Sequence, residues 1–219
     1  MLDNGSIHNN QAKQYDKEIS KDLNDYLREN YFQTLDRVTA LAEINKGMKV
    51  LDIGVGTGLL TERLPKGSLN FGIDISEKML KKAEGKNLPI KLVKGNFLNI
   101  PFKNNKIHRI ISTFALHHLS PIEKQKAFKE MDRVLLGDGI IVIGDFMFKD
   151  ENQKNEVIKK FKEENRNDML LELEDEYFMN IRKIEKYLNG LSYKVTYERA
   201  SVLSWIFKAK KCRLYKFKA

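Results

Sequence analysis

The residues best suited to bind a ligand are the three glycines of the segment 52–58, Asp-Ile-Gly-Val-Gly-Thr-Gly. A short apolar run typical of a buried strand precedes this segment, and a helical pattern follows it. A glycine turn between a strand and a helix lets backbone amides approach a ligand beside the helix N-terminus. We expect Gly54 to permit the tight turn, and Gly56 and Gly58 to leave room for a cofactor that a Cβ atom would strike. Asp52 is the last residue but one of the strand, 49–53, that leads into the turn.

A second acidic residue stands where the next strand is expected to end. Asp74 follows the apolar run 69–73, 22 residues after Asp52, where a carboxylate can accept hydrogen bonds from both hydroxyls of a ribose. This pairing serves nicotinamide and flavin dinucleotides as well as S-adenosylmethionine. The dinucleotide pattern G-x-G-x-x-G would require glycine at position 59, where this chain has Leu59. The glycine spacing therefore contains no feature that is specific for the pyrophosphate of a dinucleotide.

Strand and helix patterns alternate between residues 46 and 150. The short apolar runs 49–53, 69–73, 90–93, 107–113 and 140–143 predict strands that are buried on both faces. Helical patterns at residues 59–64 and 77–84 follow the first two strands, and a capping box at Ser120 and Glu123 predicts the start of a helix that ends at the glycines 137 and 139. Such alternation indicates an α/β fold, a parallel sheet with helices on both faces.

The two ends of the chain have different patterns. Residues 1–45 are expected to form a helical prelude, and residues 151–180 show helical patches without a strand signal, which we interpret as an insertion over the end of the sheet. A short helix at 181–188 precedes two alternating segments, 193–199 and 201–208, which are too close in sequence for a crossover helix. They should form a hairpin that adds one antiparallel strand to the sheet.

Composition predicts one domain over residues 1–219. The 219 residues are 42% hydrophobic, which suits a single core. The sequence contains no run of 18 apolar residues, the length that a membrane-spanning helix requires. The polar start of the chain does not resemble a secretion signal, so we expect a cytoplasmic protein. Cys212 is the single cysteine, and no Cys/His cluster has the spacing of a structural zinc site, so no metal is predicted.

Basic residues are concentrated in two segments. The net charge is +9, with 12 basic against 5 acidic residues in 48–118 and 8 against 1 in 192–219. Lysines outnumber arginines by 30 to 9, whereas planar bidentate recognition of phosphate favours arginine. We interpret the excess as a solvated basic surface, with RNA or an anionic substrate as the alternative partner.

Four motifs together resemble one known family. The segments VLDIGVGTG at 50–58, GIDIS at 72–76, GNF at 95–97 and FALHHL at 114–119 are similar to class I S-adenosylmethionine-dependent methyltransferases, most closely to the small-molecule, ubiquinone/menaquinone-methyltransferase-like type. The resemblance implies a Rossmann-like, mostly parallel sheet of seven strands in the order 3-2-1-4-5-7-6, with strand 7 antiparallel, and an N-terminal helical lid.

The resemblance also implies which residues bind the cofactor. It assigns Asp52, Gly54, Gly56 and Gly58 to the methionine end of S-adenosylmethionine, and Asp74 with Ile75 to its ribose. Asn96 and Phe97 follow the third strand, where the family usually has an acidic residue beside the adenine; Asn96 lacks that charge. Tyr15 in the prelude is expected to approach the cofactor's carboxylate, and Phe114 is expected to line the methyl-transfer cleft; a core role for Tyr15 and a turn role for Asn96 are alternatives.

His117, His118 and Asp145 are the candidate catalytic residues. The histidines recur in the family at this position, where one of them could be a base, although packing, helix capping or orientation of the substrate would also explain them. Asp145 is expected at the end of the fifth strand, where its position favours a role toward the acceptor, and a solvated loop carboxylate is the alternative. Tyr177, Phe178 and Met179 in the insertion could form an acceptor wall or belong to the core.

These residues predict a methyltransferase that acts on a small molecule without a metal. The sulfonium of the cofactor already activates the methyl group, so the protein mainly has to align the acceptor and exclude water. Two alternatives keep the cofactor: an RNA methyltransferase that uses the lysine-rich segments 78–109 and 192–219, and a binding protein without catalytic activity.

Overall fold

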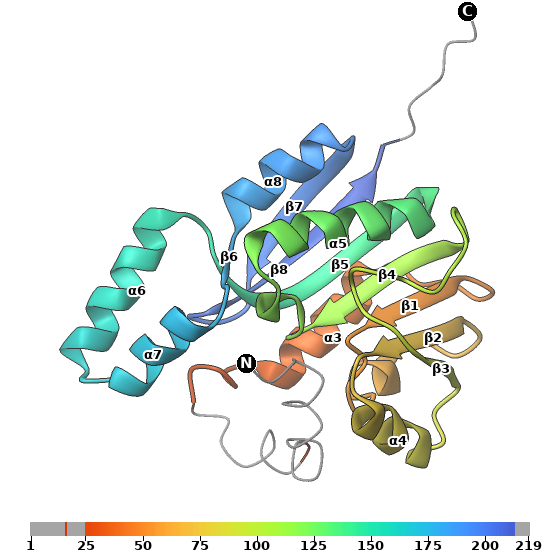
Figure 1. The fold of residues 1–219 in the computed structure, drawn as a ribbon, viewed down its shortest axis with the longest axis horizontal. Coiled ribbons are helices and arrows are strands. Elements are labelled where there is room, and N and C mark those ends of the chain that lie inside the picture. The colour runs from red at the N-terminus through yellow and green to blue at the C-terminus, as the bar shows by residue number, and fades with distance from the viewer. Residues whose placement is uncertain (1–15, 17–24, 213–219) are drawn as a thin grey trace, which may run out of the picture.

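A computed structural model describes residue 16 and residues 25–212, and its central feature is a mixed β-sheet (Figure 1). The strands run in the order β3-β2-β1-β4-β5-β8-β7, and a short strand, β6, pairs with β5 outside this path. The strands are β1 (Lys49–Ile53), β2 (Leu69–Asp74), β3 (Ile90–Lys94), β4 (Ile107–Thr113), β5 (Leu135–Phe148), β6 (Met179–Asn180), β7 (Tyr193–Arg199) and β8 (Ser204–Lys211).

The sheet confirms the expected α/β class and strand order, with one strand more than the seven expected. Strands β1 to β5 are mutually parallel where they pair, and β8 is antiparallel to both β5 and β7, as the hairpin prediction required. The additional strand is Met179–Asn180, whose two residues pair with Met147 and Phe148 of β5. The expectation that residues 151–180 contain no strand was therefore wrong, because so short a pairing leaves no alternating pattern in the sequence.

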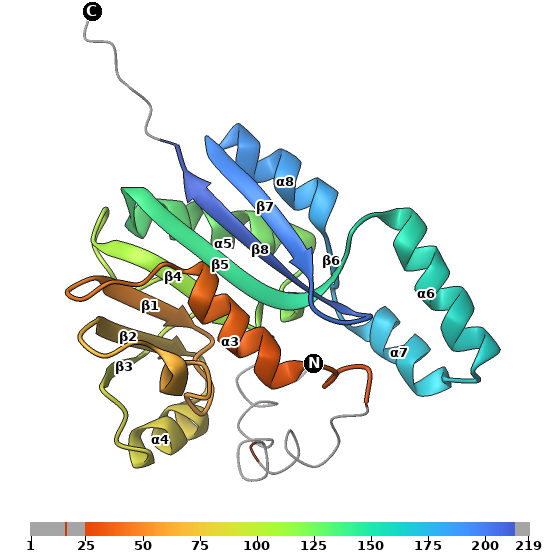
Figure 2. The same ribbon diagram turned by 180° about the vertical axis from the view of Figure 1, so that it is seen from behind.

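Helices cover both faces of the sheet. The α-helices are α3 (Tyr31–Leu41), α4 (Glu77–Gly85), α5 (Pro121–Val134), α6 (Glu151–Glu163), α7 (Asn167–Asp175) and α8 (Ile181–Gly190), with short 3₁₀ turns η1 (Thr61–Arg63) and η2 (Leu116–His118). Figure 1 shows α5 and α8 on the near face, and Figure 2 shows α3 crossing the opposite face. Helices α6 and α7 lie beyond the end of β5 that leads into them.

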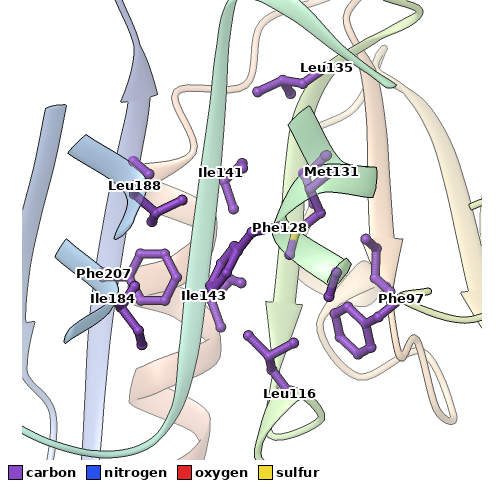
Figure 3. Close-up of a cluster of buried hydrophobic side chains, with 14 of the residues drawn as sticks. Phe97, Leu116, Phe128, Met131, Leu135, Ile141, Ile143, Ile184, Leu188 and Phe207 are labelled. Atoms are coloured by element: carbon purple, nitrogen blue, oxygen red, sulfur yellow. The ribbon is translucent and has the colours of Figure 1, made fainter. Parts of the chain in front are cut away.

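The side chains of β5 point alternately to the two faces of the sheet and contribute to a hydrophobic core on each face. Ile141 and Ile143 point to the face of α5 and α8, where Phe128, Leu188 and Phe207 pack around them (Figure 3). Ile140 and Val142, the intervening residues, belong to the core under α3 on the other face. Because successive side chains of a strand point to opposite faces, a continuous apolar run is what a strand covered on both sides requires.

Strand β5 is much longer than the predicted run 140–143. Helix α5 ends at Val134 and β5 begins at the next residue, so the glycines 137 and 139 lie inside the strand rather than in a connecting loop. The pairing with β4 is irregular there, since Ile107 pairs with Leu135 but Arg109 pairs with Ile140. A Cβ at Gly139 would lie 2.3 Å from Leu135 Cγ, so the irregular strand needs glycine at this position.

Two helical predictions were only partly correct. The pattern at 59–64 forms just the 3₁₀ turn η1, because Leu64 is extended, as a residue before proline prefers. Of the prelude, residues 1–15 and 17–24 lie outside the described residues, and α3 starts only at Tyr31, after Asn30 adopts a left-handed conformation with φ 56°. Within residue 16 and residues 25–212, no helix is long and apolar enough to cross a membrane.

The core under α8 yields a stability prediction. Leu188→Ala removes a fully buried side chain from the main cluster, and we expect it to lower the free energy of unfolding by about 2–5 kcal/mol. Leu171→Ala is the matched control, because Leu171 is 60% exposed on α7 and its loss should change stability by no more than about 0.5 kcal/mol. Urea unfolding of the two variants measures both values, and equal losses would contradict the assignment of the core.

Candidate functional site

A cavity of about 490 Å³ opens at the carboxyl ends of β1 to β5. Its wall begins at the glycine loop after β1, passes over Asp74 at the end of β2 and reaches Phe146 near the end of β5. Of the predicted site residues, the wall includes Gly54, Gly56, Asp74, Ile75, Asn96, Phe97, Phe114, His117 and His118. The strand order therefore brings together residues that are up to 64 positions apart in the sequence, from position 54 to position 118.

The glycine loop is bent and held by backbone hydrogen bonds. The N–H groups of Gly54 and Val55 both donate to the carbonyl oxygen of Ile73, at 2.8 and 3.0 Å. Gly56 has a φ of 54°, and a Cβ built there meets no atom within 4 Å, so the position opens into the cavity. The positive φ favours glycine, and the open space leaves room for a ligand against the backbone.

Gly54 and Gly58 serve the packing of the loop. A Cβ at Gly54 would lie 2.5 Å from Ala115 Cβ, and one at Gly58 would lie 2.7 Å from Leu88 Cδ1. Gly58 is also absent from the cavity wall. The expectation that Gly58 leaves room for a cofactor is therefore corrected, because the space it keeps free is filled by the protein's own side chains.

Asp74 joins the glycine loop to the start of α4. Its Oδ2 accepts the N–H of Gly56 at 2.8 Å, and its Oδ1 accepts the N–H of Ser76 at 2.8 Å. Ser76 in turn caps α4 by accepting the N–H of Met79. These two hydrogen bonds fix the orientation of the Asp74 carboxylate at the edge of the cavity.

Asp52 lies beneath the loop and not in the cavity wall. The residue is 1% exposed, and its Oδ2 accepts the hydroxyl of Thr61 at 3.0 Å. Burial raises the pKa of Asp52 to about 7; nearby Asp74 also raises it, while the Thr61 hydrogen bond lowers it. The structure thus corrects the expectation that Asp52 faces a ligand: it is enclosed by the turn that the ligand would contact.

Asn96 forms a turn at the adenine end predicted for the cavity. Its Oδ1 accepts the N–H groups of Leu98 and Asn99, both at 2.9 Å. These two bonds fix the orientation of the side-chain amide and occupy both lone pairs of its oxygen. Asn96 therefore has the turn-forming role that was the alternative for this residue. Only its side-chain NH₂ group remains to contact a ligand. Phe97 and Ile75 line the cavity beside it.

His117 and Asp145 form a buried pair at the opposite end. His117 Nδ1 lies 2.6 Å from Asp145 Oδ1, and Asp145 also accepts the N–H groups of Leu116, His117 and Phe146. Burial by itself would raise the pKa of Asp145, but His117 and the backbone amides outweigh it and hold that pKa below the usual value. The ionised carboxylate requires a proton on Nδ1, so Nε2 is the remaining functional nitrogen of His117.

Asp145 itself does not reach the cavity. It is fully buried and absent from the wall, whereas His117 lines it. The expectation that Asp145 points toward an acceptor is corrected, because its four hydrogen bonds aim it at His117 and the surrounding backbone. The sequence placed it at the end of a strand of four residues, but β5 continues to Phe148 and covers it.

His118 has a different partner. Its Nδ1 lies 3.0 Å from Glu176 Oε1, in the segment between α7 and β6. Burial alone would raise the pKa of Glu176, but His118 outweighs it and lowers that pKa. His117, His118 and Glu176 also offer ligand atoms within 4.8 Å of one another, and they are the one group in the described part of the chain that could hold a metal ion.

Aromatic side chains line the same end of the cavity. Phe114 has a φ of 49° and stacks on Tyr31 at 4.7 Å between ring centroids, and Phe146 lies 5.2 Å from Phe114. Phe178 stacks on the far side of Phe146 at 5.1 Å. It lines a second cavity of about 480 Å³ with Tyr177 and Met179, so these three predicted wall residues face that cavity instead.

Lys124 lines the second cavity and was not singled out from the sequence. It is buried, and its Nζ donates to the carbonyl oxygens of Leu119 and Tyr177, which ties η2 to the segment before β6. Burial lowers the pKa of Lys124 to about 8, against the nearby carboxylates Asp145 and Glu176, which raise it. The sequence does indicate that Lys124 is buried, because its spacing places it on the apolar face of α5 with Ala127, Phe128 and Met131.

Tyr15 lies outside the described residues, but its neighbour Asp16 does not. Asp16 Oδ1 accepts the hydroxyl of Thr57 at 2.5 Å, and its Oδ2 lies 3.0 Å from Lys86 Nζ. Asp16 thus contacts the glycine loop directly. Thr57 itself is part of the cavity wall.

Comparison with known proteins identifies similar sequences. The family described as "Methyltransferase domain" matches residues 50–139. An uncharacterized methyltransferase of Oceanobacillus iheyensis is 33% identical over 184 residues, which cover 84% of this chain and 86% of the relative. An uncharacterized methyltransferase of Alkaliphilus oremlandii is 33% identical over 214 residues, covering 96% of this chain and 99% of the relative.

Solved structures share the fold. The magnesium protoporphyrin IX methyltransferase ChlM of Synechocystis PCC 6803, crystallised with bound SAM, superposes with a TM-score of 0.68 at 20% identity, over 97% of this chain and 99% of that protein. A SAM-dependent methyltransferase from Aquifex aeolicus gives a TM-score of 0.62 at 20% identity, over 90% of this chain and 98% of that protein.

The buried carboxyl of Asp52 predicts a pH dependence of stability. Its pKa is about 7 in the fold against an ordinary value of 3.8, so the folded chain binds this proton more tightly, and the free energy of unfolding falls as the pH rises through this interval. Asp52→Asn removes that titration. Relative to the unmodified protein, its free energy of unfolding should therefore rise by about 1–3 kcal/mol between pH 5 and pH 8.

Urea unfolding at both pH values measures this difference. Thr61→Val serves as the comparison, because it keeps the Asp52 carboxyl and should lose stability with rising pH as the unmodified protein does. A difference between Asp52→Asn and the unmodified protein that does not change with pH would contradict the raised pKa.

Proposed function

Since the chain belongs to the class I S-adenosylmethionine-dependent methyltransferase family, we propose that it transfers the cofactor's methyl group to a small molecule bound in the cavity beside His117 and Phe114. The observation that carries this proposal is that one cavity has two chemically different ends. One end has the glycine loop and Asp74, and the other has the His117–Asp145 pair among aromatic rings.

The first end fits S-adenosylmethionine. Gly56 leaves space against the backbone where a side chain would protrude, and Asp74 lines the cavity at the end of β2, the position where a carboxylate binds ribose hydroxyls in this fold. Ile75, Asn96 and Phe97 then surround the adenine. Asp52 and Gly58 support the loop from below, and Tyr15 belongs to this group through its sequence motif alone.

The second end fits an acceptor that must lose a proton. When bound, S-adenosylmethionine supplies a methyl group that its sulfonium already activates. Asp145 holds the proton on His117 Nδ1, which leaves Nε2 as the base for an acceptor hydroxyl, thiol or ammonium. Phe114 and Phe146 exclude water from the same space. His118 is held by Glu176 and is the second candidate base.

The transfer needs no metal in this proposal. An activated methyl group requires alignment with the acceptor and removal of water, and neither task needs a Lewis acid. His117 and His118 each use Nδ1 in a hydrogen bond to a carboxylate, an arrangement that suits a base and its orienting group. Treatment with a chelator should accordingly leave turnover unchanged.

RNA remains the alternative acceptor. It would bind the lysine-rich segments 78–109 and 192–219, but several of these lysines are paired within the fold: Lys94 with Glu77, Lys208 with Glu43, and Lys211 with Asp132. Such pairing reduces the charge available to phosphates. Binding of RNA that weakens steeply with salt, with methyl incorporation into the RNA, would favour the alternative.

Substitution of Asp74 tests the cofactor site. We expect Asp74→Ala to weaken binding of S-adenosylhomocysteine by about 10- to 100-fold, because a charge-assisted hydrogen bond to the ribose and the bond that orients the loop are both lost. Isothermal titration calorimetry measures the change. Glu77→Gln, three residues away and exposed, is the matched control and should bind as the unmodified protein does. Failure of the unmodified protein to bind S-adenosylhomocysteine would refute the proposed function.

Substitution of His117 tests the acceptor end. His117→Asn should reduce turnover by about 10²- to 10⁴-fold with little change in S-adenosylhomocysteine affinity, because the base is lost while the cofactor end is untouched. Release of S-adenosylhomocysteine with a panel of phenols, thiols and amines gives the rate. Asp145→Asn should shift the pH profile of turnover in addition, since the orienting carboxylate is removed. An unchanged rate in His117→Asn would assign the base role elsewhere.

A further inference from the structure

Arg28 is an arginine whose charge has no partner within the described part of the chain. It lies in the turn before α3 and lines the cavity. The other arginines within residues 25–212 all donate hydrogen bonds from their side chains: Arg37, Arg63, Arg109, Arg133, Arg166, Arg182 and Arg199. No such bond or ion pair to a described residue is formed by the guanidinium of Arg28. A half-buried arginine in a cavity wall, whose side-chain donors have no described partner, calls for an acceptor from outside the chain.

The acidic residues around Arg28 are used elsewhere. Asp25 Oδ1 accepts the N–H of Leu27, and Glu29 Oε2 accepts the N–H of Val202. Of the carboxylates that line the cavity, Asp74 is bound by backbone amides, and Glu123 accepts the N–H and hydroxyl of Ser120. Each of these carboxylates is thus hydrogen-bonded to a group other than Arg28. The positive charge of Arg28 is therefore available to a ligand.

The neighbours of Arg28 place it at the aromatic end of the cavity. Leu27 packs in the cluster that contains Phe146 and Phe148, and Tyr31 stacks on Phe114. The backbone between them is fixed, since Asp25 O accepts the N–H of Arg28 and Arg28 O accepts the N–H of Tyr31. Arg28 thus belongs to the part of the cavity where the methionine end of the cofactor and the acceptor would meet, and not to the adenine end at Asn96.

We propose that Arg28 binds a carboxylate inside this cavity. A guanidinium matches a carboxylate with two parallel hydrogen bonds, and the cavity wall around it offers aromatic surface that excludes water. The inference rests on the proposed function, which supplies two sources of such a group: the methionine carboxylate of the cofactor, or a carboxylate on the acceptor. Either source makes Arg28 a specificity residue for an anionic group.

Two adenosyl ligands separate these sources. S-adenosylhomocysteine carries the amino-acid carboxylate, whereas 5′-methylthioadenosine has the same adenosine thioether without it. If Arg28 holds the methionine carboxylate, Arg28→Gln weakens S-adenosylhomocysteine by about 10- to 100-fold and leaves 5′-methylthioadenosine unchanged. If Arg28 holds the acceptor, both affinities are unchanged, and phenylacetate binds the S-adenosylhomocysteine complex of the unmodified protein but not that of Arg28→Gln.

Matched variants make the calorimetry decisive. Arg37→Gln removes an arginine whose partner is Glu198, away from the cavity wall, and should behave as the unmodified protein does. Arg28→Lys keeps the charge without the bidentate geometry, and should recover part of the lost affinity. Equal weakening of both adenosyl ligands in Arg28→Gln would indicate a structural role and overturn the proposal. So would unchanged adenosyl binding without phenylacetate binding that depends on Arg28.

The order of titrations separates this proposal from the proposed function. Binding of S-adenosylhomocysteine to the unmodified protein is measured first, and its absence would refute the cofactor site and with it the carboxylate site. When the unmodified protein binds S-adenosylhomocysteine, every later result bears on Arg28 alone.

Discussion

The carboxylate of Asp74 is the interaction on which the cofactor end depends. It accepts one amide from the glycine loop after β1 and one from the start of α4, so a single side chain fixes two segments that come from neighbouring strands. The loop can reach this position because Gly56 adopts a positive φ. A ligand that contacts Asp74 therefore meets a site that is already ordered, which reduces the entropy lost on binding.

Three buried aspartates have different roles because their surroundings differ. Asp52 has one hydroxyl donor and little else, so burial dominates and its pKa rises. Asp145 is equally buried, but a histidine and three backbone amides keep its pKa low. Asp74, at the cavity edge, is oriented by two amides. The first supports the loop, the second orients His117, and the third is the one that borders the cavity.

Most of the sheet could be predicted from local pattern. The runs at 49–53 and 107–113 coincide with β1 and β4, and the capping box at Ser120 is formed as expected. Predictions failed where pairing at a distance decided the structure: β5 extends from Leu135 to Phe148 because β4 and β8 pair along it, and β6 exists through two residues opposite Met147 and Phe148. Likewise, nothing local to Asp145 shows that four donors surround it.

The sequence by itself determined the glycine loop, the acidic residue after the second strand and the alternation of strands and helices, because each depends on residues close together in the chain. Only the tertiary structure decided which side chains face the cavity. It buried Asp52 and Asp145 beneath the wall, filled the space at Gly58 with Leu88, and brought Glu176 to His118 and Lys124 to Tyr177. The physical reason is that burial and charge pairing depend on neighbours in space, which the order of residues along one segment does not contain.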